Sequence, residues 1–174
     1  MRVRRLPAHG RDQNAPAPHP GVRMPVFSTT ITTEIEIDAA PREVWDVLAD
    51  RESSGDWNPV MRECSGRVEV GQRLTNRMYP SDGKPVTFRP VVTVADPGRE
   101  LRWLGRFVLP KVFDGEHSFV LTELPGQRTR LTQAETFSGL LVPFVGGMIK
   151  KTAHDFDLQN RALKAHLEKQ VSKP

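Results

Sequence analysis

The chain has 174 residues, of which 37% are hydrophobic and 26% are charged, and its formal net charge is +4. This length is enough for one domain with a buried core. Residues 1–23 hold five arginines and a single acidic residue, Asp12, so they carry the whole net charge. Because the remainder is formally neutral, the sequence predicts no nucleic-acid-binding surface on the folded part.

Cysteine usage and apolar runs bear on the location of the protein. Cys64 is the single cysteine, which excludes an internal disulfide. No stretch approaches the roughly 18 consecutive apolar residues of a membrane span. The N-terminus also lacks the apolar region of a secretory signal. We therefore expect a cytoplasmic protein without stable membrane insertion.

Residues 1–25 are rich in proline and arginine and show almost no apolar periodicity. Such a composition cannot offset the entropy lost on ordering, so it predicts a disordered basic arm. The arm would be a tether for an acidic surface, an organelle-targeting peptide, or an over-extended reading frame with Met24 as the natural start. We favour the last interpretation and place the folded domain at residues 26–170.

The folded part begins with a strand and then helical segments. Residues 26–37 alternate between apolar and polar side chains, as in a strand with one buried face. A short helix follows, with Pro41 in its first turn, and its pattern stops near Asp50. The segment 56–59 then forms a loop that its tryptophan, Trp57, anchors to the core.

Six strand-like runs separated by turn residues come next. Short connections of this kind join antiparallel neighbours. The runs cover residues 62–70, 73–79, 86–95, 100–109, 112–122 and 129–137. Together with the first strand they predict a curved seven-stranded antiparallel sheet, the β layer of an α+β fold.

Residues 143–170 form the last predicted element, one long amphipathic helix. The positions of its buried stripe recur three, four or seven residues apart. They are Val145, Ile149, Thr152, Phe156, Leu163 and Leu167. A helix of about 25 residues is roughly 37 Å long and needs a large apolar surface. It would cover only the centre of a curved sheet, which leaves a cavity between the two layers.

These segments resemble those of a known superfamily. The stretches EIEIDAAPREVWDVLAD, DWNP and FDGEHSFVLTEL, followed by the terminal helix, are similar to START/Bet v 1-like (SRPBCC) proteins. Within this superfamily they are most like the bacterial polyketide cyclase/dehydrase-like lipid-binding proteins. The resemblance covers residues 26–170 and implies a helix-grip fold, in which the sheet wraps the helix around an apolar cavity. It implies no single activity, because the superfamily contains lipid carriers, aromatase/cyclases and hydrolase-like members.

The last two strands place a histidine and a glutamate on one inward face. If their hairpin turns at residues 125–127, residues whose numbers sum to about 252 lie opposite each other, which pairs His117 with Glu135. Apolar neighbours on the same face indicate that it points inward. Such a pair could act as general acid and base. Alternatively it is a mutually satisfied pair that sets the polarity of the cavity, and this is the interpretation we favour.

Other side chains would line the cavity from the inward faces of the strands, from the inward track of the helix and from the loop at Trp57. The candidate ligand-binding residues are Trp57, Phe88, Trp103, Phe119, Phe137, Met148, Thr152, Phe156 and Asn160. For each aromatic residue, a place in an ordinary core is the alternative role. Trp57 would gate one end of the cavity, although anchoring a loop is its simpler role. Asn160 is the polar residue on the inward track of the helix.

Residues 140–142, Leu-Leu-Val, are unusually apolar for a loop. They either pack under the first turn of the helix or form an exposed surface. In the second case they would be a lid, or an entrance that touches a membrane or a second subunit.

Our leading hypothesis is the binding, and carriage, of an apolar or lipid-like small molecule between sheet and helix. One alternative is a cyclase or dehydratase-type enzyme that uses His117 and Glu135. Another is a protein-interaction module that docks through residues 140–142. The five histidines show no metal-ligand spacing and no nucleotide-binding motif occurs, so we expect no metal and no cofactor. The expected partner is a hydrophobic ligand, bound by a monomer or a homodimer.

Overall fold

The computed structural model describes residues 27–81, 83–107, 112–144 and 146–171. The predicted arm, residues 1–25, lies outside this range. In chain order the elements are β1 (Ser28–Ile37), α1 (Pro41–Ala49), α2 (Ser54–Trp57), β2 (Met61–Ser65), β3 (Thr75–Met78), β4 (Val86–Phe88), β5 (Val91–Asp96), β6 (Glu100–Phe107), β7 (Phe113–Leu124), β8 (Arg128–Ser138), a 3₁₀ turn (Val142–Phe144) and α3 (Gly146–Val171).

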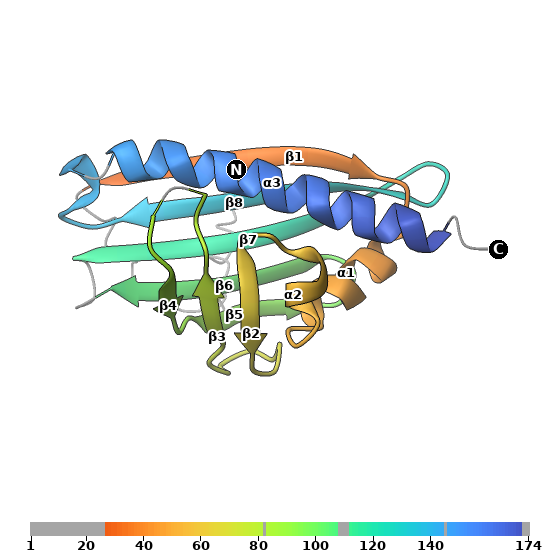
Figure 1. Cartoon of the computed structure of the whole chain (residues 1–174), viewed down its shortest axis with the longest axis horizontal. Coiled ribbons are helices and arrows are strands. Elements are labelled where there is room, and N and C mark those ends of the chain that lie inside the picture. The colour runs from red at the N-terminus through yellow and green to blue at the C-terminus, as the bar shows by residue number, and fades with distance from the viewer. Residues whose placement is uncertain (1–26, 82, 108–111, 145, 172–174) are drawn as a thin grey trace, which may run out of the picture.

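The strands form two antiparallel sheets. The larger has five strands in the order β1-β8-β7-β6-β5, and the smaller has three in the order β2-β3-β4. Helix α3 runs along β1, with the small sheet on the β5–β6 side of the molecule (Figure 1). This arrangement is the predicted α+β fold, with two short helices after the first strand and one long helix at the C-terminal end.

The prediction of a single seven-stranded sheet is wrong in one region. The run 86–95 divides into β4 and β5 because Pro90 has no N–H to donate to a ladder. Strands β2, β3 and β4 then form a separate sheet, which a bridge between Arg73 and Val91 joins to β5. Among the described residues the strand count is therefore eight.

The hairpin of β7 and β8 has the predicted register. His117 lies opposite Glu135, and Leu121 lies opposite Leu131. Within the turn, Gly126 and Gln127 have φ angles of 82° and 55°. Glycine adopts such a conformation without steric strain, so Gly126 suits the first of these positions. The turn thereby sets which side chains of both strands face α3.

Helix α3 begins at Gly146, three residues later than predicted. Pro143 belongs instead to the preceding 3₁₀ turn, where the N–H of Phe144 donates to the carbonyl of Leu141 at 3.0 Å. Along the helix, Phe156, Leu163 and Leu167 are buried and Thr152 is half-buried, as the stripe predicts. Val145 and the side chain of Ile149 lie outside the described structure. None of the described helices is long and apolar enough to cross a membrane.

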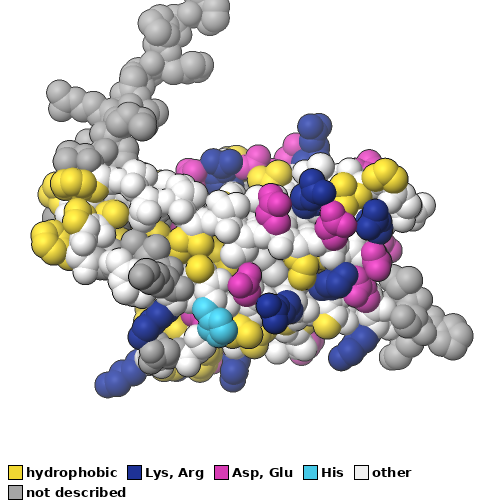
Figure 2. Space-filling view, turned by 90° about the horizontal axis from the view of Figure 1, so that it is seen from above, with side chains coloured by type: hydrophobic (Ala, Val, Ile, Leu, Met, Phe, Trp, Pro, Cys, Tyr) yellow, Lys and Arg dark blue, Asp and Glu magenta, His cyan; other side chains and the backbone are white. Residues whose placement is uncertain are grey.

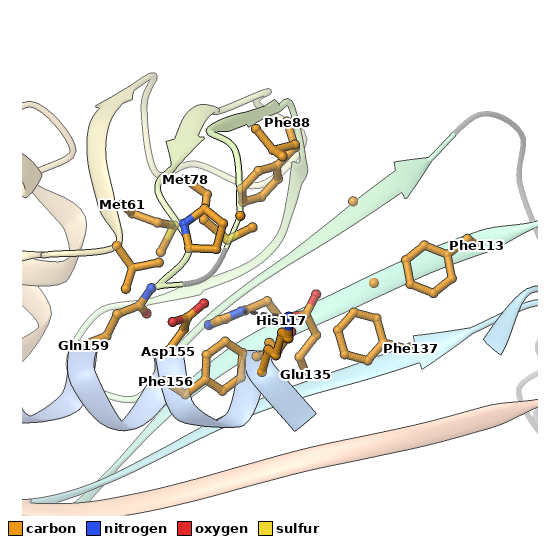
Figure 3. Close-up of a pocket in the computed structure, with 18 of the residues that line it drawn as sticks. Met61, Met78, Phe88, Phe113, His117, Glu135, Phe137, Asp155, Phe156 and Gln159 are labelled. Carbon is orange, nitrogen blue, oxygen red and sulfur yellow. Dashed lines mark ion pairs between the residues drawn. The ribbon is translucent and has the colours of Figure 1, made fainter. Parts of the chain in front are cut away.

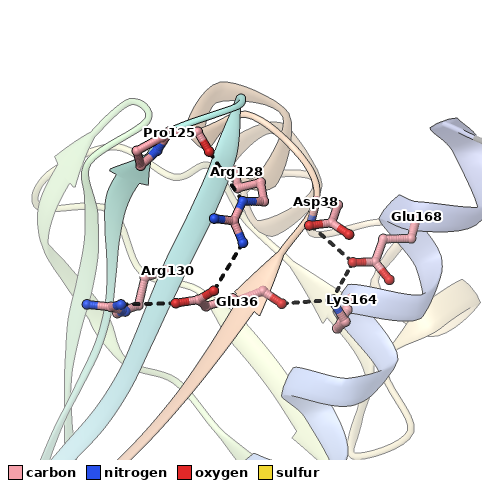
Figure 4. A network of polar contacts seen from close by, with 7 residues as sticks. All are labelled: Glu36, Asp38, Pro125, Arg128, Arg130, Lys164 and Glu168. Carbon is pink, nitrogen blue, oxygen red and sulfur yellow. Dashed lines mark hydrogen bonds and ion pairs between the residues drawn. The ribbon is translucent and has the colours of Figure 1, made fainter.

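The C-terminal half of α3 is tied to the end of β1 by a polar network (Figure 4). Lys164 Nζ donates to the carbonyl of Glu36 at 2.8 Å and pairs with Glu168. Glu168 Oε1 also accepts the N–H of Asp38 at 3.1 Å. The side chain of Glu36 pairs with Arg128 and Arg130 of β8. This half of the helix is therefore closely fixed to the sheet.

Candidate ligand-binding site

A cavity of about 550 Å³ lies between the N-terminal half of α3, the five-stranded sheet and the small sheet (Figure 3). Its walls are mainly apolar. The lining residues are Val60, Met61, Met78, Pro80, Gly83, Lys84, Val86, Phe88, Trp103, Gly105, Phe113, Gly115, His117, Glu135, Phe137, Leu141, Lys151, Thr152, Asp155, Phe156 and Gln159. The exposed members of this set, which include Lys84, Val86, Leu141 and Lys151, mark the mouth.

Two aromatic stacks flank a pair of glycines in the sheet wall. Trp103 stacks on His117 with ring centroids 4.8 Å apart, and Phe113 stacks on Phe137 at 5.5 Å. Between the stacks, Gly105 of β6 lies opposite Gly115 of β7. Neither glycine has a side chain, so Gly105 leaves the backbone open to the cavity, while the space over Gly115 is taken by the Glu135 carboxylate.

His117 is fixed by polar groups on both sides of its ring. Its Nδ1 lies 3.7 Å from Glu135 Oε2, and its Nε2 lies 3.2 Å from Gln133 Nε2. The Gln133 amide also donates to Gln159 Oε1 at 3.0 Å. With an amide nitrogen as neighbour, Nε2 accepts and the ring proton sits on Nδ1, an assignment made from these contacts. The N–H of His117 is thus directed toward the Glu135 carboxylate.

Helix α3 closes the opposite side of the cavity. Phe156 meets the His117 ring edge-on with centroids 4.9 Å apart, and Figure 3 shows it reaching toward His117 and Glu135. Asp155 Oδ1 accepts the N–H of Ser81 at 3.1 Å. This bond holds the β3–β4 connection against the helix.

A buried arginine supports the back of the aromatic wall. Arg51 is only 4% exposed, and its guanidinium lies 5.5 Å from the Trp103 ring centroid. Nη2 donates to Asn76 Oδ1 at 2.8 Å, and Nη1 donates to the carbonyl of Leu48. Burial lowers the pKa of Arg51, while interaction with Cys64 partly opposes that effect. Within the described residues it forms no ion pair with an aspartate or glutamate.

Of the eleven residues predicted for the site, seven line the cavity: Phe88, Trp103, His117, Glu135, Phe137, Thr152 and Phe156. Three others lie elsewhere. Trp57 packs near His166, with ring centroids 6.5 Å apart, and Phe119 packs edge-on to Trp103 within the core. Asn160 donates to Thr33 Oγ1 at 2.9 Å and so faces β1. The side chain of Met148 lies outside the described structure.

Sequence reasoning missed several lining residues. An isolated glycine inside a strand is a sign of close backbone approach, and this sign could have identified Gly105 and Gly115. Gln159 lies one position from the predicted Asn160. The small sheet contributes Met61 and Met78. Its strands are too short to show a clear alternation of apolar and polar residues that would identify these two as inward-facing.

Exposed apolar residues gather where α3 begins (Figure 2). Leu140 and Leu141 are 55% and 43% exposed, Phe144 is 82% exposed and Phe27 is 45% exposed. Val142, in contrast, is buried. The segment therefore combines both roles considered for it: Val142 packs inward, while its neighbours form an exposed apolar surface beside the cavity mouth.

A curved antiparallel sheet that holds a long C-terminal helix around an apolar cavity defines the helix-grip class of ligand-binding folds. The profile of a family described as "Polyketide cyclase / dehydrase and lipid transport" matches residues 28–168. The chain belongs to this family. No curated protein matches the sequence.

Solved structures of low sequence identity share the fold. The Zhui aromatase/cyclase from Streptomyces sp. R1128 has a TM-score of 0.69 at 17% identity, over 83% of this chain and 96% of that one. A START superfamily protein from Mycobacterium smegmatis has a TM-score of 0.65 at 18% identity, over 81% and 98%. Norcoclaurine synthase from Thalictrum flavum, a point mutant with a transition-state analogue, has a TM-score of 0.65 at 12% identity, over 84% and 98%.

Proposed function

We propose that the protein binds, and carries, an apolar or lipid-like small molecule in the cavity between α3 and the sheet. The observation that carries this proposal is the cavity itself. Its volume of about 550 Å³ lies within the range of roughly 300 to 1,000 Å³ that is usual for small-molecule sites. Its walls are apolar, with a few polar groups at fixed positions. The lipid-transport part of the family description agrees with this role.

The proposal is tested by ligand binding to the full chain. Native mass spectrometry would detect apolar molecules that co-purify, and titration with the neutral fluorophore N-phenyl-1-naphthylamine would measure binding directly. Gly105→Leu places a side chain in the cavity, because the nearest atom to a Cβ there is 3.7 Å away. We expect this variant to lose fluorophore binding at least tenfold.

A matched control adds the same side chain outside the cavity. Arg106 is the next residue of β6 and is exposed, so Arg106→Leu should bind the fluorophore as the wild type does. Equal binding by Gly105→Leu and wild type, with no co-purifying ligand, would overturn the proposal.

A second candidate function is catalysis of cyclisation or dehydration on a bound polyketide-like substrate. The contact of His117 with Glu135 at the cavity wall favours it, and a structurally similar protein is an aromatase/cyclase. In this role Glu135 would accept a proton from the substrate, and His117 in its protonated form would deliver one from Nδ1 and become a neutral imidazole. His117→Ala should then abolish turnover and leave ligand affinity nearly intact. Equal loss of turnover and affinity would argue against catalysis.

A third candidate is docking of a second copy of the chain through residues 140–142. The exposure of Leu140 and Leu141 favours it. Light scattering after size-exclusion chromatography would show a dimer that Leu140→Ser with Leu141→Ser converts to a monomer. A wild-type protein that is monomeric at all concentrations tested would exclude this role.

A further inference from the structure

The polar groups of the cavity differ in how far their acceptor atoms are already used. Gln159 Oε1 accepts from Gln133, and Asp155 Oδ1 accepts from Ser81. Within the described residues the second oxygen of Asp155, Oδ2, accepts no hydrogen bond, and the same holds for one oxygen of Glu135 on the opposite wall. For Glu135, the one polar contact within the described residues is the 3.7 Å approach of His117 Nδ1 to Oε2, and its side chain is only 18% exposed. Oxygen Oε1 is therefore an acceptor without a partner in the described protein, on the wall of an apolar cavity.

The position of this oxygen depends on a glycine. A Cβ built on Gly115 would lie 2.6 Å from Glu135 Oε1, so the carboxylate rests directly over the bare backbone of β7. Gly105 lies opposite Gly115 and leaves the adjoining wall open. The acceptor therefore stands beside a flat strip of backbone, where a ligand body can approach it.

A carboxylate accepts hydrogen bonds and offers none. In apolar surroundings an acceptor without a donor is unfavourable, so a ligand that brings an O–H gains more here than at an exposed site. At Glu135 a ligand that brings a second carboxylate meets like charge, whereas the lysines of the lining, Lys84 and Lys151, are exposed at the mouth. Resting on the proposed binding function, we propose that Glu135 over Gly115 is a specificity subsite that selects apolar ligands with a neutral hydroxyl and disfavours carboxylic acids.

Three ligands with one ring system test this subsite. They are 2-naphthalenemethanol, its methyl ether and 2-naphthoic acid, each titrated against the full chain by fluorescence. The wild type should bind the alcohol about tenfold more tightly than the ether, the magnitude expected for a hydrogen bond to a charged acceptor. The acid should bind more weakly than both.

Glu135→Gln keeps the shape of the side chain but replaces the charged acceptor with an amide. It should reduce the preference for the alcohol over the ether to less than about threefold and strengthen binding of the acid. Glu123→Gln, on an exposed position of the same strand as Gly115, serves as the control and should leave all three affinities unchanged. Circular dichroism melting would verify that both variants fold.

The outcomes separate the subsite from the binding function. Binding of alcohol and ether with equal affinity overturns the subsite and leaves the binding function intact. An alcohol preference that Glu135→Gln does not change also overturns the subsite and leaves the binding function intact. Binding of the acid as tightly as the alcohol also overturns the subsite. Binding of none of the three ligands, together with failure of N-phenyl-1-naphthylamine to bind, overturns both proposals.

Discussion

The carboxylate of Glu135 occupies the space that a side chain at Gly115 would need, because a Cβ there would lie 2.6 Å from Oε1. Gly105, directly across the ladder from Gly115, has no such neighbour: the nearest atom to its Cβ would be 3.7 Å away. The space over the two glycines is therefore used differently. One makes room for a polar group of the protein, and the other leaves room in the cavity.

This difference predicts unequal effects of the same substitution. Gly115→Ala should displace the Glu135 carboxylate from His117, while changing stability by no more than about 1 kcal/mol, because the flexible end of a glutamate can move aside. The ratio of its affinity for the alcohol to its affinity for the ether should fall, as in Glu135→Gln. Gly105→Ala should have the same ratio of affinities as the wild type. Urea unfolding and fluorescence titration measure both quantities, and an unchanged ratio in Gly115→Ala would contradict the role assigned to this glycine.

The facing of His117 and Glu135 could be predicted because it depends on two local rules. Side chains alternate along a strand, and the turn at residues 125–127 sets the register of the hairpin. The residues of the helix that face the cavity were harder to predict. The predicted inward track advanced four residues at a time, from Thr152 to Phe156 to Asn160. Since a helix has 3.6 residues per turn, each such step rotates the side chain by about 40°. Asn160 therefore faces β1, and Gln159 faces the cavity.

Parity also could not show where along a strand the cavity ends. Phe119 shares the inward face of His117, two residues away, but it packs in the core beside Trp103. The boundary depends on which parts of the sheet are covered by α1 and the C-terminal half of α3, and this is a tertiary property. The separate small sheet likewise follows from the break at Pro90. A proline inside a strand-like run is a sign of such a break, but which strands pair on either side of it is a tertiary property.

The two ends of α3 should respond differently to truncation of a buried side chain. Phe156 lies at the cavity, and Leu163 lies in the core cluster with 1% exposure. Leu163→Ala should destabilise the protein by about 3 kcal/mol and leave fluorophore affinity within about twofold. Phe156→Ala should instead change the affinity of N-phenyl-1-naphthylamine at least fivefold. Chemical denaturation and titration of both variants measure the contrast, which would be refuted by equal changes in affinity.

The buried Arg51 predicts a non-additive effect on stability. Asn76→Ala removes the acceptor of Nη2 and leaves a buried charge with one hydrogen bond fewer, which should cost about 2 kcal/mol. Adding Arg51→Met replaces the charge with an apolar side chain, so the double variant should be more stable than Asn76→Ala alone. Urea unfolding of the single and double variants completes the cycle. A double variant whose loss equals the sum of the two single losses would show that the two side chains act independently.

The network that ties α3 to β1 should weaken in acid (Figure 4). Partial burial raises the pKa of Glu168, but the hydrogen bonds from Lys164 and from the N–H of Asp38 outweigh it, and the net pKa is lowered. A carboxyl group with a lowered pKa in the folded state stabilises the fold above its unfolded pKa of about 4.3. That contribution is lost as the pH falls below this value and through the lower folded pKa.

Glu168→Gln should therefore be less stable than the wild type at pH 7, by no more than about 1 kcal/mol, because the ion pair is partly exposed and screened by solvent. The difference should shrink as the pH falls below about 4.3. Urea unfolding at pH 7, 5 and 3 measures it, with Glu123→Gln as the control because its side chain is exposed. A stability difference that persists unchanged at pH 3 would mean that Glu168 acts through packing, since a protonated carboxyl group no longer pairs with Lys164.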